Sequence, residues 1–154
     1  RKVQKKIVKK KVVAKKKATV GYGWLIIDSD IRARVSIDGD IDYINLHGTG
    51  TQNNDIAEGT AIKRLFDPHY PKMSSTKTFT GHTLGASGGI EAVFSVLALQ
   101  HGIIFPNLRL QTPMVDLPFV PEREFIKNAT VKHVLSNSFG FGGNCSSLIF
   151  SKVD

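Results

Sequence analysis

The stretch GASGGIEAVFSVLALQHG, residues 85–102, constrains the fold of this chain more than any other. It has the length of an α-helix, and apolar side chains surround it on nearly every side, whereas a surface helix keeps one polar face. Gly102 follows it at the position where a left-handed glycine commonly ends a helix. We therefore expect this helix to be central and buried, covered by other elements.

Shorter elements precede this helix. The runs IDYINLHG (41–48) and KMSSTKT (72–78) indicate strands, and DIAEGTAIKRLF (55–66) between them indicates a helix. Asp55 and Glu58 have the spacing of a capping box at the start of that helix. The order strand, helix, strand, helix predicts an α/β layer architecture.

Two further segments follow the apolar helix. Residues 103–130 hold four prolines and predict an irregular, extended connection. Residues 131–152, VKHVLSNSFGFGGNCSSLIFSK, predict two strands joined by a glycine-rich turn. The whole pattern is that of one α/β domain.

The net charge of +8 is confined to the beginning of the chain. Residues 1–17 hold nine lysines, one arginine and no acid, and the remainder holds eleven basic and thirteen acidic residues. Blocks of like charge are usually solvated arms, and no arginine or aromatic pattern accompanies this one. We expect no nucleic-acid partner and, because no run approaches a membrane span, no membrane. A single cysteine excludes a disulfide framework and favours a reducing compartment, the cytoplasm.

Two histidines and a lysine lie where an α/β sheet gathers its chemistry. His47 and Lys77 fall at the ends of predicted strands, and His82 falls in the turn before the apolar helix. Neutral imidazoles can donate hydrogen bonds to an oxyanion that develops during a reaction. A purely structural buried polar cluster is the alternative that the spacing leaves open.

A serine nucleophile is a second hypothesis. Ser87 lies in GASGG, which fits G-x-S-x-G, and the chain order Ser87, Asp116, His133 suits a hydrolase triad. The strand that should lead directly into such a serine is not adjacent, however. The alternative is that the small residues around Ser87 let the helix pack closely against a neighbouring backbone.

Two other kinds of site fit the sequence less well. His47, His82 and Cys145 include no closely spaced ligand pair, so no metal is expected. The turn GFGGN, residues 140–144, lacks the Lys-Ser/Thr that follows a phosphate loop. Its backbone N–H groups are better suited to approach a substrate carbonyl. Cys145 reads as a small buried side chain rather than a nucleophile.

Three motifs resemble those of one family. The motifs INLHGTGTQNND, SSTKTFTGHTLGASGGIEA and LSNSFGFGGNCSSLIF are similar, in order and spacing, to those of the β-ketoacyl-acyl-carrier-protein synthases. The resemblance runs from about Ile41 to Lys152. It implies the thiolase-like fold of two similar α/β halves, of which this chain would be the C-terminal half, with a mixed sheet packed with helices.

The resemblance also implies roles for particular residues. His47 and His82 correspond to the two histidines of a Cys-His-His triad, and Lys77 to the lysine that supports them. The remaining functional positions are an acidic companion of the lysine, two threonines that hold a phosphopantetheine arm, and a gating phenylalanine with its oxyanion-hole glycines. These are Glu91; Thr49 and Thr51; and Phe141, Gly140 and Gly142.

The implied reaction is a decarboxylative condensation of a malonyl thioester with an acyl thioester, with no cofactor. The implied partner is acyl carrier protein, and the full-length enzyme would form a homodimer or heterodimer. The alternative is an inactive fragment or a partner that acts like a chain-length factor.

The sequence departs from the family in two places. The family's nucleophilic cysteine belongs to the N-terminal half; Cys145 stands where asparagine is usual and Asn144 where threonine is usual. Residues 18–40 do not resemble the family segment expected there. We therefore expect a basic arm over 1–17, a truncated or frame-shifted segment over 18–40 and the synthase domain over 41–154.

Overall fold

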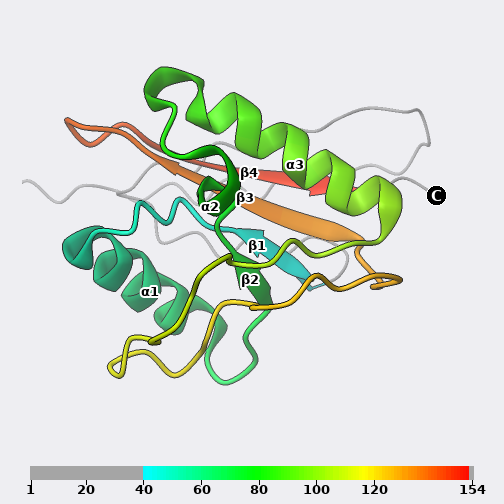
Figure 1. Cartoon of the computed structure of the whole chain (residues 1–154), viewed down its shortest axis with the longest axis horizontal. Helices are drawn as coiled ribbons and strands as arrows, with labels where there is room; N and C mark the ends of the chain where they lie inside the picture. Colours follow the sequence, from blue (N-terminus) through cyan, green and yellow to red (C-terminus); the bar gives the residue numbers. More distant parts are fainter. Residues whose placement is uncertain (1–39, 153–154) are drawn as a thin grey trace, which may run out of the picture.

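The computed structural model describes residues 40–152, which form a mixed four-stranded sheet with helices packed on it (Figure 1). The strands are β1 (Tyr43–Asn45), β2 (Lys72–Ser74), β3 (His133–Phe139) and β4 (Cys145–Ser151). The helices are α1 (Gln52–Phe66), α2 (Lys77–Thr80), the 3-10 turn η1 (Leu84–Ala86) and α3 (Ser87–His101). The expectations for residues 1–17 and most of 18–40 lie outside the described residues.

The sheet has the order β2-β1-β3-β4. Strand β1 runs parallel to β2 and β3, whereas β4 runs antiparallel to β3 as the second strand of a hairpin. The predicted α/β class and mixed sheet are therefore confirmed. So is the glycine-rich turn between the last two strands, where Gly142 and Gly143 have φ of 82° and 85°, a backbone conformation that favours glycine.

The alternation of side chains along β1 places one helix on each face of the sheet. Tyr43 is fully buried and belongs to an apolar cluster with Ala98 of α3. Its neighbour Ile44 is also fully buried, but it belongs to a second cluster with Ile62 of α1. The parity of β1 therefore decides which of its side chains meet α3, and Asn45 shares the parity of Tyr43.

Helix α1 begins three residues earlier than the sequence indicates. Thr51 is its N-cap residue, and no side chain caps the helix. The capping box predicted from Asp55 and Glu58 is wrong, because the Glu58 carboxylate is buried and makes its hydrogen bonds at the end of β1 instead. A capping box depends only on residues that are neighbours in sequence. Here the Glu58 carboxylate bonds instead to backbone groups that the fold brings next to it.

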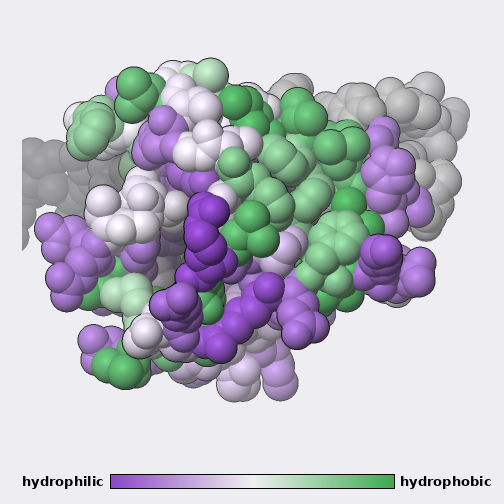
Figure 2. Space-filling view, in the orientation of Figure 1, coloured by the Kyte–Doolittle hydropathy of each residue, from purple (hydrophilic) through white to green (hydrophobic). Residues whose placement is uncertain are grey.

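Helix α3 ends as predicted and is covered less completely than predicted. Gly102 adopts the left-handed conformation, with φ 57° and ψ 50°, and stops the helix. One face packs on β3 and β4. On the other face Val93 is 60% exposed, so within residues 40–152 the helix is not buried all round. Figure 2 shows this apolar face as a green area over α3.

The connection from α3 to β3 is irregular, as its prolines predict. Among residues 40–152, its only regular pairing is an isolated antiparallel bridge between Ile104 and Ile126. None of the helices in the described part of the chain combines the length and apolarity that crossing a membrane requires.

Candidate active site

His47 lies two residues beyond the end of β1, and the backbone turns sharply after it. Gly48 has φ +42°, and a Cβ atom built on it would lie 2.6 Å from Cβ of Ser75. Glycine is needed here both for the backbone angle and for the close approach. The Ser75 hydroxyl donates to the Gly48 carbonyl across this contact, at 3.1 Å. The turn therefore docks the end of β1 on the segment that leads from β2 to Lys77.

Lys77 lies at the beginning of α2 and not at the end of a strand as predicted. Its side chain is 6% exposed, and its ammonium donates to Glu91 Oε1, to the His47 carbonyl and, at 3.3 Å, to His47 Nδ1. An ammonium has three N–H donors, so each of them has an acceptor here. The lysine thereby joins the strand-end histidine to α3.

Glu91 receives further hydrogen bonds that explain Ser87. The hydroxyls of Ser87 and Ser138 donate to its carboxylate at 3.4 and 3.3 Å. Ser87 is buried, and His133, the base of the hypothetical triad, instead contacts the Ser151 hydroxyl. The serine-hydrolase hypothesis is therefore not supported by the geometry; Ser87 helps to hold the partner of Lys77.

His82 lies in the turn between α2 and η1, beside His47. The two rings meet edge to face, with centroids 5.5 Å apart and an interplanar angle of 88°. The backbone N–H of Leu84 donates to His82 Nδ1 at 3.1 Å. Because Nδ1 accepts in His82, and accepts from Lys77 in His47, the neutral form of each ring carries its proton on Nε2. The pair can thus offer two Nε2–H donors.

The surroundings of His47 keep its ring neutral. Burial, the nearby charge of Lys77 and the neighbouring His82, in decreasing order of effect, together lower the pKa of His47 from its ordinary value to about 4. A neutral imidazole that donates from Nε2 can stabilise negative charge on oxygen without first losing a proton.

We predict that His47 does not titrate between pH 8 and pH 5. The unfolded chain binds this proton near the ordinary pKa of about 6.5, and the folded chain only near 4. The contribution of His47 to the free energy of unfolding should therefore rise with pH between about 4 and 6.5. Imidazole NMR shifts of His47 should stay constant down to pH 5. A midpoint near 6.5 would contradict the prediction.

The matched comparison for stability is His47→Gln against the wild type. Glu58 acts in the opposite sense, because burial raises the pKa of its carboxyl and its proton favours the folded state at low pH. Subtracting one unfolding free energy from the other removes the contribution of Glu58. The remaining difference between the wild type and His47→Gln should shrink as the pH falls from about 6.5 toward 4.

Glu58, predicted from the sequence only as part of a capping box, also belongs to this site. Its carboxylate accepts the backbone N–H groups of His47 and Gly48, both at 2.9 Å, and the Asn137 amide at 3.0 Å. Asn137 in turn accepts the Ser147 hydroxyl at 2.8 Å. A chain of hydrogen bonds therefore runs from β4 through β3 and α1 to the backbone that carries the catalytic candidate His47.

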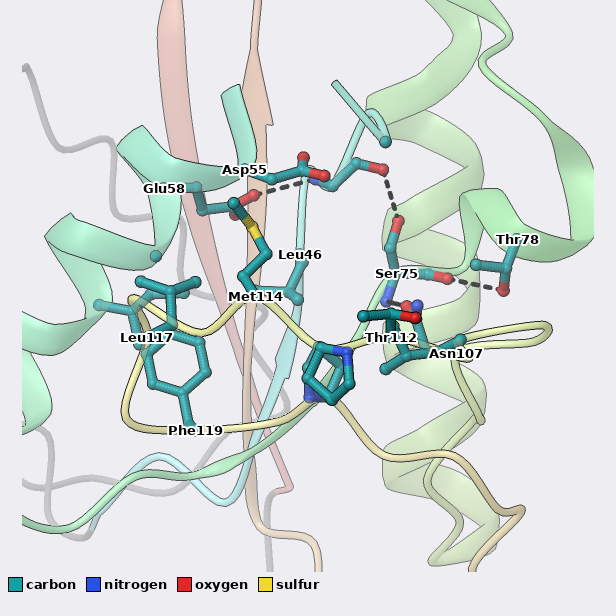
Figure 3. Close-up of a pocket in the computed structure, with 17 residues that line it drawn as sticks. Leu46, Asp55, Glu58, Ser75, Thr78, Asn107, Thr112, Met114, Leu117 and Phe119 are labelled. Carbon is teal, nitrogen blue, oxygen red and sulfur yellow. Dashed lines mark hydrogen bonds between the residues drawn. The ribbon is translucent and has the colours of Figure 1, made fainter. Parts of the chain in front are cut away.

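A cavity of about 250 Å³ lies behind this turn, between α1 and the irregular connection. Figure 3 shows Glu58 on one side of it and Ser75 on the other, and Met114, Leu117 and Phe119 of the connection also line it. The hydrogen bonds drawn there include those that join Glu58 and Ser75 to the Gly48 turn. These hydrogen bonds therefore hold the Gly48 turn in place where it borders the cavity.

Other predicted site residues are placed farther from this cluster of contacts. The hydroxyls of Thr49 and Thr51 bond to each other at 2.8 Å in an exposed position. Phe141 is 98% exposed in the turn between β3 and β4. It is Phe139 whose ring contacts His47, at 5.2 Å between centroids. The sequence SFGFGG alone does not indicate which of its two phenylalanines contacts the histidine.

The glycines of this turn have different surroundings. The Gly140 N–H donates to the Asn144 carbonyl at 2.8 Å, whereas a Cβ on Gly142 would meet no atom within 4 Å. Cys145, the first residue of β4, is partly buried. Within residues 40–152, no group of three or more His, Cys, Asp or Glu side chains is arranged to hold a metal.

The fold and the site define a class: an α/β domain that presents two adjacent imidazoles, one of them backed by a buried Lys–Glu pair. The profile of the family described as "Beta-ketoacyl synthase, C-terminal domain" matches residues 29–111. This chain belongs to the β-ketoacyl synthase family. The match begins inside residues 18–40, the segment predicted not to resemble the family.

Individual relatives agree with the family assignment. The 3-oxoacyl-[acyl-carrier-protein] synthase 1 of Haemophilus influenzae is 42% identical over 126 residues, which are 80% of this chain and 30% of that protein. Two solved structures are similar at TM-scores of 0.69 and 0.67, each over 74% of this chain and 28% of theirs. They are the ishigamide ketosynthase/chain length factor, 35% identical, and a type II polyketide synthase acyl-carrier protein in complex with its ketosynthase, 33% identical. The chain thus spans about 30% of the length of these relatives.

Proposed function

We propose that this domain supplies the two-histidine part of a β-ketoacyl synthase active site, which condenses a malonyl thioester with an enzyme-bound acyl group. The observation that carries the proposal is the pair of adjacent imidazoles, His47 and His82, each held through Nδ1 so that Nε2–H is left to donate. The family membership supports it.

The chemistry that these donors suit is decarboxylation. The bond between the malonyl carboxylate and the adjacent carbon breaks, carbon dioxide leaves, and the electron pair forms an enolate on the thioester oxygen. Two Nε2–H donors aimed at that oxygen stabilise the charge as it develops. The enolate carbon then attacks the acyl thioester, and the enzyme thiolate leaves. Cys145 is the only cysteine of the 154 residues and lies in β4, so we assign the acyl-carrying thiol to another part of the complete enzyme.

For the finer roles we keep the assignments that the resemblance implies. Thr49 and Thr51 would bind the phosphopantetheine arm, and Phe141, flanked by Gly140 and Gly142, would gate the site and supply an oxyanion-hole N–H. The partner would be acyl carrier protein, which one similar structure contains in complex with its ketosynthase. The complete enzyme would be a homodimer or heterodimer in the cytoplasm.

The test is decarboxylation of malonyl-carrier protein by the complete enzyme. We expect His82→Ala to lower the rate by about 10²–10³, the usual effect of losing one oxyanion donor. His69→Ala is the matched control, because His69 lies in an exposed turn outside the site, and it should leave the rate unchanged. Equal rates for His82→Ala and the wild type would refute the assignment.

A non-catalytic role is the second candidate, since one similar structure is a ketosynthase/chain length factor. Under that hypothesis neither the wild type nor His82→Ala decarboxylates, even when joined to a part that bears a cysteine nucleophile. A serine-ester probe that labelled Ser87 would instead revive the hydrolase hypothesis, against the buried position of its hydroxyl.

A further inference from the structure

One buried amide connects the segments that carry His47, Lys77 and Glu91. Asn45, the last residue of β1, is fully buried. Its Nδ2 donates to the Glu91 carbonyl at 3.0 Å and to the Ser95 hydroxyl at 3.5 Å. Its Oδ1 accepts the backbone N–H and the hydroxyl of Thr76 at 3.3 and 3.2 Å. The two donors and two acceptor positions of the amide are thus all used.

These partners stand next to the residues of the site. Thr76 directly precedes Lys77. Glu91, whose backbone carbonyl accepts from Asn45, also accepts the Lys77 ammonium through its carboxylate. His47 follows Asn45 by two residues along the same chain, so both side chains share one face of the strand. A single side chain therefore ties together the backbones of β1, the start of α2 and α3.

We propose that Asn45 is a positioning residue, which sets the mutual placement of His47, Lys77 and Glu91 through the Thr76 and Glu91 backbones. The inference rests on the proposed function. An amide is suited to this task because it donates to α3 and accepts from the start of α2 at the same time. An aspartate lacks the donor, and an apolar side chain of equal size lacks both.

The charges around His47 make its titration a readout of this placement. Lys77 from α2 and His82 from the following turn face its ring, Glu58 from α1 binds its backbone, and Glu91 from α3 acts through Lys77. If the start of α2 shifts, water and a displaced ammonium should allow the pKa of His47 to rise from about 4 toward its ordinary value.

The decisive comparison uses Thr76. Thr76→Val keeps the shape of the side chain but loses the hydroxyl that donates to Asn45 Oδ1. Thr76→Ser keeps that hydroxyl. Asn45→Ala removes the whole connection. On the full chain, NMR should find the His47 pKa raised in Thr76→Val and more so in Asn45→Ala, and unchanged in Thr76→Ser. If Thr76→Val unfolds more easily but His47 titrates as in the wild type, Asn45 is only structural and the proposal is wrong.

Catalysis gives a separate reading. In the complete enzyme we expect Thr76→Val to lower kcat for malonyl decarboxylation roughly tenfold with little change in KM. The reason is that a small misplacement of the hydrogen-bond donors reduces their stabilisation of the transition state. Thr76→Ser should retain wild-type kcat. A wild type that does not decarboxylate overturns the proposed function alone, because the His47 titration tests Asn45 without any turnover. A kcat for Thr76→Val equal to that of Thr76→Ser counts against the positioning role.

Discussion

Replacing Lys77 with methionine should both destabilise the domain and stop its chemistry. The substitution leaves the Glu91 carboxylate, which is 2% exposed as a residue, buried without its cation. Breaking a buried ion pair in this way typically costs about 3–5 kcal/mol in the free energy of unfolding. It also removes the donor to His47 Nδ1, so the tautomer of that ring is no longer fixed. Urea unfolding of the full chain measures the first effect, and malonyl decarboxylation by the complete enzyme the second.

The double variant Lys77→Met/Glu91→Leu separates the two effects. Apolar replacement of both partners of a buried pair is often neutral for stability, so most of the lost free energy should return. Decarboxylation should stay at the level of the single variant, since nothing restores the donor to His47. Recovery of activity in the double variant would show that the lysine serves only to neutralise Glu91.

The second large effect is expected at the turn after His47. Gly48→Ala places a methyl group 2.6 Å from Ser75 Cβ, in a backbone conformation with φ +42°. Gly50→Ala is the matched control, because Gly50 also has positive φ, at +75°, but a Cβ there meets nothing within 4 Å. Left-handed strain costs about 1–2 kcal/mol at either position, and the clash adds about 1–3 kcal/mol at Gly48 alone.

Activity should separate these glycines more sharply than stability does. The Gly48 N–H bonds to Glu58 and its carbonyl to Ser75, so a displaced Gly48 moves the backbone of His47 directly. We expect Gly48→Ala to lose malonyl decarboxylation and Gly50→Ala to retain most of it, measured in the complete enzyme. Similar losses in both variants would mean that left-handed strain, and not the approach to Ser75, is what matters.

Sequence patterns sufficed for the elements and for one part of the site. The apolar helix, the stop at Gly102 and the final hairpin follow from periodicity and glycine chemistry, and they are confirmed. His47, Lys77 and His82 were expected near one another because the chain places each beside a strand end or a helix start, and the structure brings them into contact.

The rest depends on contacts that no local pattern encodes. The carboxylate of Glu58 binds backbone N–H groups ten and eleven residues away, so its spacing from Asp55 suggested a cap that does not form. The side chain of Asn45 has partners 31 and 46 residues away. Phe139 and Phe141 look equivalent in sequence, but Phe139 is the last residue of β3 and contacts His47, whereas Phe141 lies in the exposed turn beyond the strand.

The parity of β1 has a consequence for the quality of any preparation of this protein. A slip of one residue would turn Asn45 and His47 into the apolar layer of α1 and bring Ile44 and Leu46 to the polar network beside α3. Such a molecule would lose its core contacts together with its imidazole donor. Folded but inactive molecules with a shifted first strand should therefore be absent, and the specific activity of the complete enzyme should track the folded fraction.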